Sequence, residues 1–219
     1  MTLLPIFLRL EGRPVLVVGA GTVALEKIRS LRAAGARLTV VAPHAAGEVQ
    51  ALATEGALEW HPRRFGAGDL EGVFVVIAAT NDSRVNHAVY EEALRRNVLC
   101  NAVDDPPNCD FYFGSVVSRG DLQVAVSTGG KSPALAQRLR REIDGQLPED
   151  LGPWLGELGQ LRDEIRAAVP AGEARTRLLH ELAQRQVCGA ASCPARQWAK
   201  ERVETIRKAA AVQAAEVKA

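Results

Sequence analysis

The sequence predicts an α/β protein built on a doubly wound parallel sheet, followed by a small α+β module and a C-terminal helical domain. Three observations predict it. Apolar runs alternate with helical segments as far as residue 103, a glycine-rich turn follows the first apolar run, and two segments of alternating pattern come later. Unbroken apolar runs are typical of parallel strands that helices cover on both faces.

The first part of the chain contains five predicted strands and three predicted helices. Residues 14–19 form the first strand, and a helix over 22–34 ends at Gly35, where glycine can take the left-handed conformation. A second strand over 37–43, a short helix over 45–56 and an edge strand over 58–62 follow. The most apolar strand covers 73–80, Asp82 caps a helix that extends to about residue 96, and 98–103 form the last parallel strand.

The pattern changes after residue 104. Residues 111–118 and 122–127 alternate apolar and polar side chains on either side of Arg119-Gly120-Asp121, which predicts a hairpin. Ser132 is the expected N-cap of a helix that starts at Pro133, and further helical segments are divided by Pro153, Pro170 and Pro194. The expected domains are 1–113, 114–149 and 150–219, and the alanine-rich tail from residue 209 is expected to fray.

Composition argues against several classes of protein. The 219 residues include 27 basic and 26 acidic ones, so a net charge of +1 argues against binding to nucleic acid or to anionic membranes. No apolar run is long enough to cross a bilayer, and residues 1–10 do not resemble a secretion signal, so we expect a cytoplasmic protein. Four cysteines are too few for a disulfide scaffold.

The sharpest local motif is G-x-G-x-x-A, at residues 19–24 between the first strand and the first helix. It predicts a Rossmann-like site, in which Gly19 permits the tight turn, Gly21 lets the backbone approach a pyrophosphate and Ala24 allows close packing. The amides at the helix start, at Thr22 and Val23, would face the anion. A turn that serves only tight packing is the alternative.

The expected cofactor is NAD. The acidic residue that commonly follows the second strand is replaced by Ala42-Pro43-His44, so backbone groups, His44 or water must hold the adenosine ribose. No arginine at this point would neutralise a 2′-phosphate, which favours NAD over NADP. Thr80 and Asn81 end a strand at the same sheet edge, where contact with the cofactor is one interpretation; the alternative is that Asn81 or Asp82 simply caps the next helix.

An ordered set of segments resembles the precorrin-2 dehydrogenases of sirohaem synthesis, including the N-terminal module of sirohaem synthase and its single-function relatives. The segments are LPIF, VVGAGTVALEK, GARLTVVAP, AATND, NAVDDP and VAVSTGGKSPALAQRLRREI, and the resemblance covers residues 3–152. It implies oxidation of precorrin-2 to sirohydrochlorin with NAD, and a central dimerisation module that makes a homodimer. Some members also insert ferrous iron as ferrochelatases, and the sequence does not decide whether this chain does.

The resemblance implies that Asp104 is the catalytic acid/base group. Asp104 follows a predicted strand at the sheet edge where such folds bind their ligands, and a carboxylate there can accept the proton that oxidation releases. The alternative is an aspartate that forms a turn before Pro106, and the adjacent Asp105 is not distinguished from Asp104 by the sequence.

An acidic tetrapyrrole needs positive groups and hydrogen-bond donors, and the glycine turn before the predicted helix at Pro133 offers both. The substrate-binding candidates are Thr128, Gly129, Lys131, Ser132 and Arg138. Capping alone explains Ser132, and a solvated helix face explains the arginines of this helix. Some sirohaem synthases carry a phosphorylated serine at the position of Thr128, so modification of this threonine stays open.

No metal site is predicted, since the chain has no H-E-x-x-H motif, no paired C-x-x-C and no histidine-rich tract. Cys188 and Cys193, with His180 before them, stay unassigned. Two other functions fit the sequence less well. A non-catalytic nucleotide-sensing module usually keeps the missing acidic residue, and a hydroxyl dehydrogenase needs a Tyr-x-x-x-Lys pair, whereas Leu94 stands at the fourth position after Tyr90.

Overall fold

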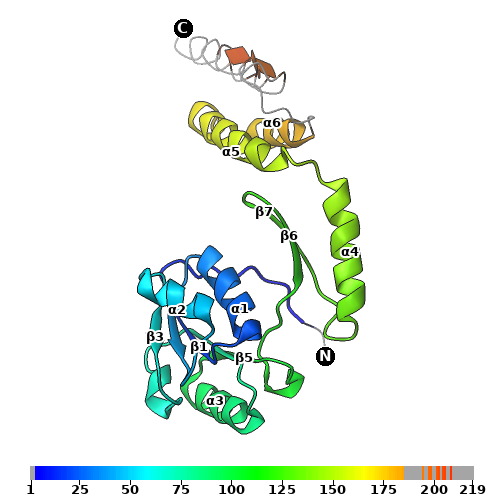
Figure 1. Ribbon diagram of the computed structural model, residues 1–219. Helices are drawn as coiled ribbons and strands as arrows, with labels where there is room; N and C mark the ends of the chain where they lie inside the picture. Colours follow the sequence, from blue (N-terminus) through cyan, green and yellow to red (C-terminus); the bar gives the residue numbers. More distant parts are fainter. Residues whose placement is uncertain are drawn as a thin grey trace. The chain divides into compact units, whose positions relative to one another are not determined.

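The computed structural model describes residues 3–184 together with 194, 197–198, 201–202, 204–205 and 208. The chain forms two compact units (Figure 1). Unit 1 comprises residues 1–113 and 129–131, and unit 2 comprises residues 114–128 and 132–219. Within the described residues, no helix combines the length and the apolar character that a bilayer crossing requires.

Unit 1 contains the predicted parallel sheet. Its strands are β1 (Pro14–Val18), β2 (Arg37–Val41), β3 (Glu59–His61), β4 (Val75–Ala78) and β5 (Leu99–Ala102), in the order β3-β2-β1-β4-β5. Every neighbouring pair is parallel. The strand order reverses between β1 and β4, and this is the position where doubly wound folds bind their ligands. The predicted α/β fold class is confirmed.

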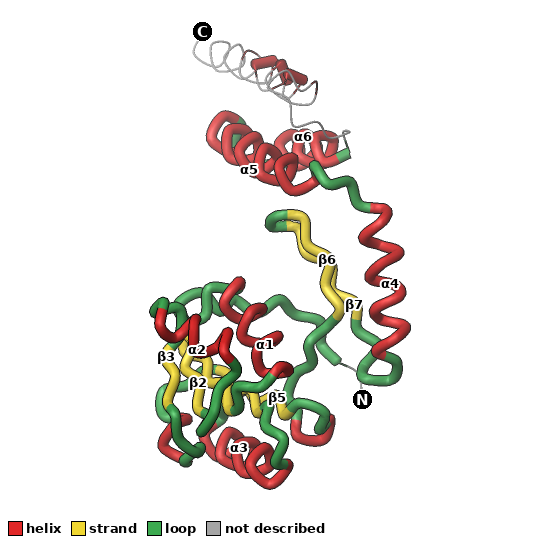
Figure 2. The backbone as a smooth tube through the Cα atoms, in the orientation of Figure 1, coloured by secondary structure: helices red, strands yellow, loops and turns green. Residues whose placement is uncertain are grey.

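Helices cover both faces of this sheet (Figure 2). Helices α1 (Thr22–Ala33) and α2 (Gly47–Thr54) pack on one face, and α3 (Ser83–Arg96) packs on the other. Alternate residues of β1 divide between the two cores, because Val15 and Val17 join α1 and α2 while Leu16 and Val18 join α3. This two-sided burial explains the unbroken apolar run. The short helices η1 (Ala67–Leu70) and η2 (Pro106–Asn108) were not predicted.

The predicted helix boundaries follow from capping. The Asp82 carboxylate accepts a hydrogen bond from the backbone N–H of Arg84 at 3.0 Å, which caps α3. Gly35 has φ +75°, the left-handed conformation that ends α1. Helix α4 (Pro133–Gln146) starts with Pro133, and the Ser132 hydroxyl accepts a hydrogen bond from the Leu135 N–H at 3.2 Å.

Unit 2 begins with the antiparallel hairpin of β6 (Ser115–Arg119) and β7 (Leu122–Val126). The hairpin was predicted, but its first strand was expected from residue 111. Phe111 instead packs against the core of α1 and α2, and its carbonyl accepts a hydrogen bond from the Asn101 side chain at 2.8 Å. Arg119 lies in β6 rather than in the turn, because Gly120 at φ +60° permits a two-residue connection.

Three helices complete the described part of unit 2. Helix α4 packs on the hairpin, where the Arg119 guanidinium donates to the Asp144 carbonyl at 3.0 Å and pairs with the Asp144 carboxylate at 2.8 Å. Helices α5 (Leu151–Ala168) and α6 (Glu173–Ala183) share a core that includes Trp154 and Leu182.

The predicted break at Pro153 is wrong. This proline lies in the first turn of α5. Backbone N–H groups in the first turn have no acceptor within the helix, so a proline there removes no helical hydrogen bond. Pro170 does separate α5 from α6. Around the predicted break at Pro194, residues 185–193 and 195–196 lie outside the described residues, as does the tail from residue 209.

We expect the substitution Gly19→Ala to destabilise unit 1 strongly. Gly19 has φ +108°, and a Cβ atom there would lie 2.3 Å from the Ala79 carbonyl oxygen. The expected loss in the free energy of unfolding is about 3 kcal/mol, measured by chemical denaturation.

The matched control is Gly21→Ala, two residues along the same turn. Nothing lies within 4 Å of a Cβ built at Gly21. We expect its free energy of unfolding to stay within about 1 kcal/mol of the wild type. Equal stability of the two variants would contradict the close approach of this turn to β4.

Candidate active site

The carboxyl ends of the central strands meet at one edge of the sheet. Val18 is in register with Val41 on β2 and with Ala78 on β4, and Ala78 is in register with Ala102 on β5. The segments that follow these four strands therefore begin side by side. They contain the predicted cofactor residues and Asp104, so the structure brings these candidates to the same edge.

The glycine turn after β1 is held closely against its neighbours. The Gly19 N–H donates to the Val41 carbonyl at 2.9 Å, and the Ala20 carbonyl accepts from the Ala46 N–H at 3.0 Å. Ala24 is completely buried where α1 packs on the sheet. Gly21 is extended, with open space where a side chain would stand. A side chain at Gly19 would therefore clash with β4 and the residue after it, whereas Gly21 leaves room for a ligand.

The start of α1 suits an anion. No side chain caps this helix, and its first turn carries no acidic residue. Thr22 and Val23 are exposed beside the open space at Gly21. Backbone N–H groups at a helix start carry a partial positive charge and bind phosphate well. The chain thus has the features that a pyrophosphate requires at this position.

The end of β2 carries no acidic group, as the sequence predicted. Pro43 and His44 are exposed there. A carboxylate nearby in the sequence, Glu48, is engaged by Arg29, whose guanidinium donates two hydrogen bonds to it at 2.9 and 2.6 Å. The Arg29 hydrogen bonds lower the pKa of Glu48. The Glu48 carboxylate is therefore held in an ion pair with Arg29.

Thr80 lies in a turn that is locked by Asn86, a buried residue of α3. The Asn86 side-chain oxygen accepts from the Thr80 hydroxyl at 2.7 Å and from its N–H at 3.1 Å, while its amide nitrogen donates to the Thr80 carbonyl at 3.0 Å. These hydrogen bonds fix the backbone of Thr80 at the sheet edge where the cofactor is expected. Sequence reasoning missed Asn86, since an asparagine early in a helix usually faces solvent.

The structure distinguishes Asp104 from Asp105. The Asp105 carboxylate accepts a hydrogen bond from the Asn108 side chain at 2.7 Å, so it is engaged within its own loop. Asp104 is exposed, and its carboxylate makes no hydrogen bond or ion pair within the part of the chain that the structure describes. Asp104 is therefore the carboxylate that is free to meet a ligand.

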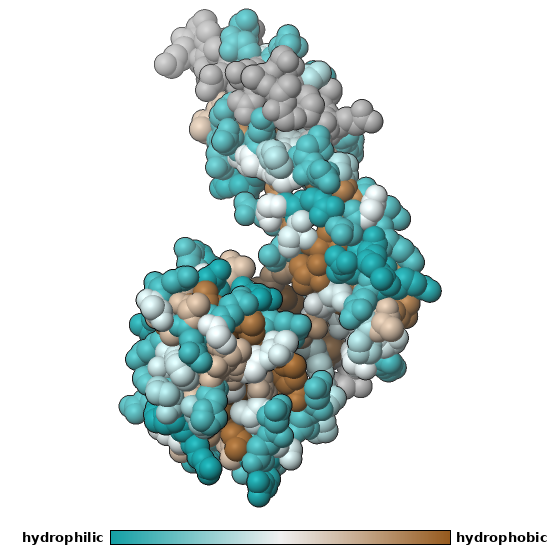
Figure 3. Space-filling view, viewed as in Figure 1, coloured by the Kyte–Doolittle hydropathy of each residue, from teal (hydrophilic) through white to brown (hydrophobic). Residues whose placement is uncertain are grey.

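The substrate-binding candidates lie around the start of α4. The Thr128 hydroxyl accepts a hydrogen bond from the Ser132 N–H at 3.1 Å, so both residues also shape the turn. Lys131 is exposed, Gly129 has φ +60°, and exposed Arg138 pairs with Glu142 at 3.3 Å. The surface over α4 is hydrophilic in Figure 3. Substrate binding by these residues stays a prediction.

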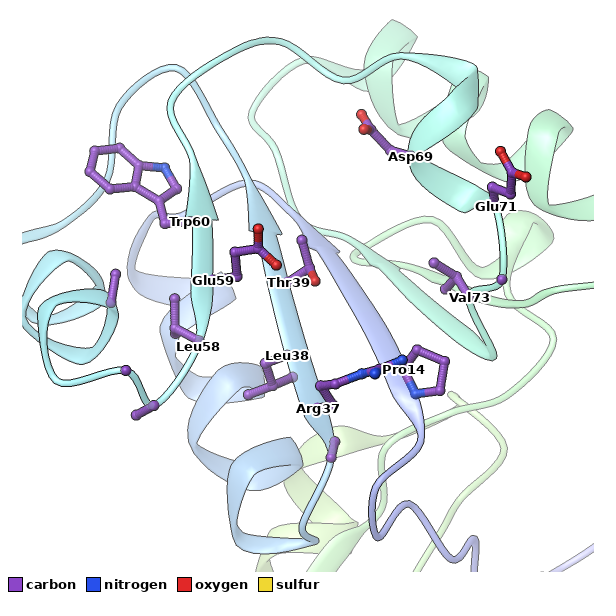
Figure 4. A pocket seen from close by; sticks show the side chains of 15 residues that line it. Pro14, Arg37, Leu38, Thr39, Leu58, Glu59, Trp60, Asp69, Glu71 and Val73 are labelled. Carbon is purple, nitrogen blue, oxygen red and sulfur yellow. The ribbon is translucent and has the colours of Figure 1, made fainter.

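A groove of about 810 Å³ lies at the opposite edge of the sheet (Figure 4). Pro14, Arg37 and Glu59, which begin β1, β2 and β3, contribute to its lining. It is therefore remote from the glycine turn. Across the described residues, no three His, Cys, Asp or Glu side chains form a group that could hold a metal ion. Cys188 and Cys193 lie outside the described residues.

Comparison with known proteins gives two family matches in the expected order. The family model titled "Putative NAD(P)-binding" matches residues 6–115, half of the chain. The model titled "Sirohaem biosynthesis protein central" matches residues 119–146. The expectation of a nicotinamide-nucleotide-binding domain is confirmed.

Curated relatives and a solved structure agree with these matches. Siroheme synthase 1 of Pectobacterium atrosepticum is 44% identical over 83% of this chain and 38% of its own length. Siroheme synthase 1 of Cronobacter sakazakii is 48% identical over 74% of this chain and 35% of its own length. The chain thus spans less than two fifths of these relatives.

The solved structure titled "SirC, precorrin-2 dehydrogenase" has a TM-score of 0.77 and 28% identity, and the match covers 93% of this chain and 100% of that one. The fold, the order of the two matched domains and this full-length structural match lead to one assignment. The chain belongs to the NAD(P)-binding family of the precorrin-2 dehydrogenases and sirohaem synthases.

Proposed function

We propose that this chain oxidises precorrin-2 to sirohydrochlorin with NAD. The observation that carries the proposal is the shared sheet edge of unit 1. There the open glycine turn after β1 and the free carboxylate of Asp104 after β5 are separated by β4 alone. The full-length similarity to a solved precorrin-2 dehydrogenase supports the same reaction.

The residues at this edge fit a dinucleotide. The pyrophosphate would lie against Gly19, Gly21 and the first N–H groups of α1, because no side chain occupies that space. The adenosine ribose would lie near Pro43 and His44 at the end of β2. When bound, NAD⁺ supplies the acceptor for a hydride.

Asp104 then has a defined part in the chemistry. Oxidation of precorrin-2 removes a hydride and a proton, and a carbon–carbon double bond forms. The Asp104 carboxylate accepts the proton, which a positioned carboxylate can do as a general base. Lys131 and Arg138 are the candidates for the positive charge that the carboxylates of the tetrapyrrole require.

The alternative is a non-catalytic nucleotide sensor. Such a module would bind NAD without needing a carboxylate held free beside the nicotinamide end of the site. The two functions differ in one assay, since a sensor leaves the absorption spectrum of added precorrin-2 unchanged. Insertion of ferrous iron into sirohydrochlorin stays a prediction from the family resemblance.

A cytoplasmic location forms part of the proposal. Cys100 and Cys109 are both free cysteines. Burial raises the pKa of the Cys100 thiol to about 12, so it stays protonated and unreactive at neutral pH. Free thiols are typical of a reducing compartment.

We propose that the chain forms a homodimer through the hairpin. The outer face of β6 and β7 carries Val116, which is 44% exposed, and Ala125 directly opposite it. Both outer edges of this two-stranded sheet lack a strand partner within the described residues. Unpaired strand edges with exposed apolar side chains favour pairing with a second copy.

Gly21→Ala is expected to weaken NAD binding while the protein stays folded. A methyl group there would occupy the space that the pyrophosphate needs. The expected rise in the dissociation constant, measured by isothermal titration calorimetry, is about tenfold or more. An unchanged dissociation constant would place the nucleotide elsewhere.

Asp104→Asn is expected to abolish most NADH formation from precorrin-2 and NAD. Loss of a general base lowers the rate by about 10²- to 10⁴-fold, while NAD affinity is retained. The comparison variant Asp105→Asn keeps an oxygen that can accept the Asn108 hydrogen bond, so its rate should stay within about threefold of the wild type. Wild-type turnover by Asp104→Asn would remove this residue from the mechanism.

The hairpin proposal predicts a dimer that Val116→Lys converts to a monomer. A charge at the centre of the interface would be costly to bury. Sedimentation equilibrium at micromolar concentration measures the mass of both proteins, with circular dichroism as the folding control. A monomeric wild type under these conditions overturns the proposal.

A further inference from the structure

Asp104 has an unusual backbone conformation. Among the described residues, Asn97 and Asp104 are the two with a side chain and a positive φ, at 55° and 60°. Asn97 ends α3, where a left-handed residue is common. Asp104 ends no helix but lies in a turn, which the Asp105 N–H closes by donating to the Ala102 carbonyl at 3.2 Å. Apart from glycine, few residues adopt the left-handed conformation, and aspartate is one of them. Such a conformation persists only where the surrounding structure imposes it.

The chain after Asp104 folds back onto β5 and closes a short loop. The Asp110 N–H donates to the Cys100 carbonyl at 2.8 Å, and the Cys100 N–H donates to the Asp110 carboxylate at 2.9 Å. The buried Asn101 side chain donates to the Phe111 carbonyl at 2.8 Å. These bonds hold both ends of the loop that carries Asp104.

Cys109 joins the two sides of Asp104 inside this loop. Its thiol lies 3.0 Å from the Ala102 carbonyl oxygen and 3.3 Å from the Asp105 carbonyl oxygen, and both oxygens are hydrogen-bond acceptors. Its sulfur also accepts a hydrogen bond from the Asn101 side chain at 3.4 Å. One acceptor precedes Asp104 in the chain and the other follows it, so the single S–H proton lies between two oxygens that flank Asp104 and adds to the backbone hydrogen bond from the Asp105 N–H to the Ala102 carbonyl.

The thiol is suited to donate rather than to react. Cys109 is half-buried, and burial raises the pKa of its thiol, so the S–H group persists at neutral pH. Ionisation would remove the donor and would place a negative sulfur beside two carbonyl oxygens. At neutral pH, Cys109 is therefore a protonated thiol that donates a hydrogen bond to a carbonyl oxygen.

We propose that Cys109 is a positioning residue for the oxidation, and that its thiol holds Asp104 in the left-handed conformation that presents the carboxylate at the ligand edge. This inference rests on the proposed function of Asp104. The competing explanation is that Cys109 only fills space, because it also packs beside the core on the α3 face.

A matched pair of variants separates these explanations. Cys109→Ser keeps a hydrogen-bond donor, whereas Cys109→Val keeps an apolar group of similar size without a donor. If the hydrogen bond matters, kcat for NADH formation falls about tenfold or more in the valine variant and stays within about threefold in the serine variant, with KM little changed in both. If Cys109 only fills space, kcat falls more in the serine variant than in the valine variant. Cys109→Ala, which adds no volume, replaces the valine variant if that variant does not fold.

A double-mutant cycle tests whether Cys109 acts through Asp104. In the Asp104→Asn background, Cys109→Val should lower the residual rate by less than about twofold, because the group that it positions is already gone. A full additional loss would mean that Cys109 acts on something else. Cys100→Ala, which removes a completely buried thiol outside the loop, is the control for general destabilisation.

Amide hydrogen exchange at Val103, Asp105 and Asn108, whose N–H groups are hydrogen-bonded, reports on the loop without reference to activity. The proposal predicts faster exchange in Cys109→Val than in the wild type and unchanged exchange in Cys109→Ser. Equal exchange in all three proteins overturns the positioning role. A wild type that forms no NADH from precorrin-2, yet shows the predicted exchange pattern, would refute the proposed reaction and leave the role of Cys109 in the loop supported.

Discussion

The site depends on the close approach of β1 and β4 at their carboxyl ends. The Gly19 backbone comes so near the Ala79 carbonyl that a Cβ atom would be 2.3 Å away. Both strands are buried on both faces and pair in register, so the turn after β1 passes directly against the end of β4. The start of α1, and with it the proposed pyrophosphate position, follows from that path.

Polar side chains at this edge divide into two groups with different physical roles. Asn86 and Asn101 are buried and hold backbone turns through hydrogen bonds to the Thr80 and Phe111 carbonyls, while the Asp105 carboxylate accepts from the Asn108 side chain. His44 and Asp104 are exposed, and Gly21 leaves open space. Buried polar groups require partners, so the first group stabilises the loops, while the second group remains available to ligands. The proposed chemistry uses the second group and relies on the first for its geometry.

The sequence predicted the sheet and its helices because their periodicities are local. Two-sided burial makes β1 and β4 continuously apolar, and caps such as Asp82 and Ser132 act within three residues. One error arose where a distant contact overrides the local pattern. Residues 111–114 read as strand, yet Phe111 is held by Asn101 from β5.

The same limit applies to the site. Position after a strand sufficed to single out Gly19, Gly21 and Asp104, since parallel strands bring their ends together. The difference between Asp104 and Asp105 depends on the Asn108 side chain, and the role of Cys109 depends on carbonyl groups before and after Asp104. The Asp105–Asn108 contact is local, but the sequence does not show which of two adjacent aspartates makes it, and the Cys109 contacts depend on the path of the loop.

The central claim is that Asp104 and the nicotinamide ring act on the same tetrapyrrole carbons. A crystal structure of the protein with NADH and sirohydrochlorin, the products of the proposed reaction, tests it most directly. The account predicts that nicotinamide C4 and the Asp104 carboxylate both contact one edge of the macrocycle. A macrocycle bound away from either group would contradict it.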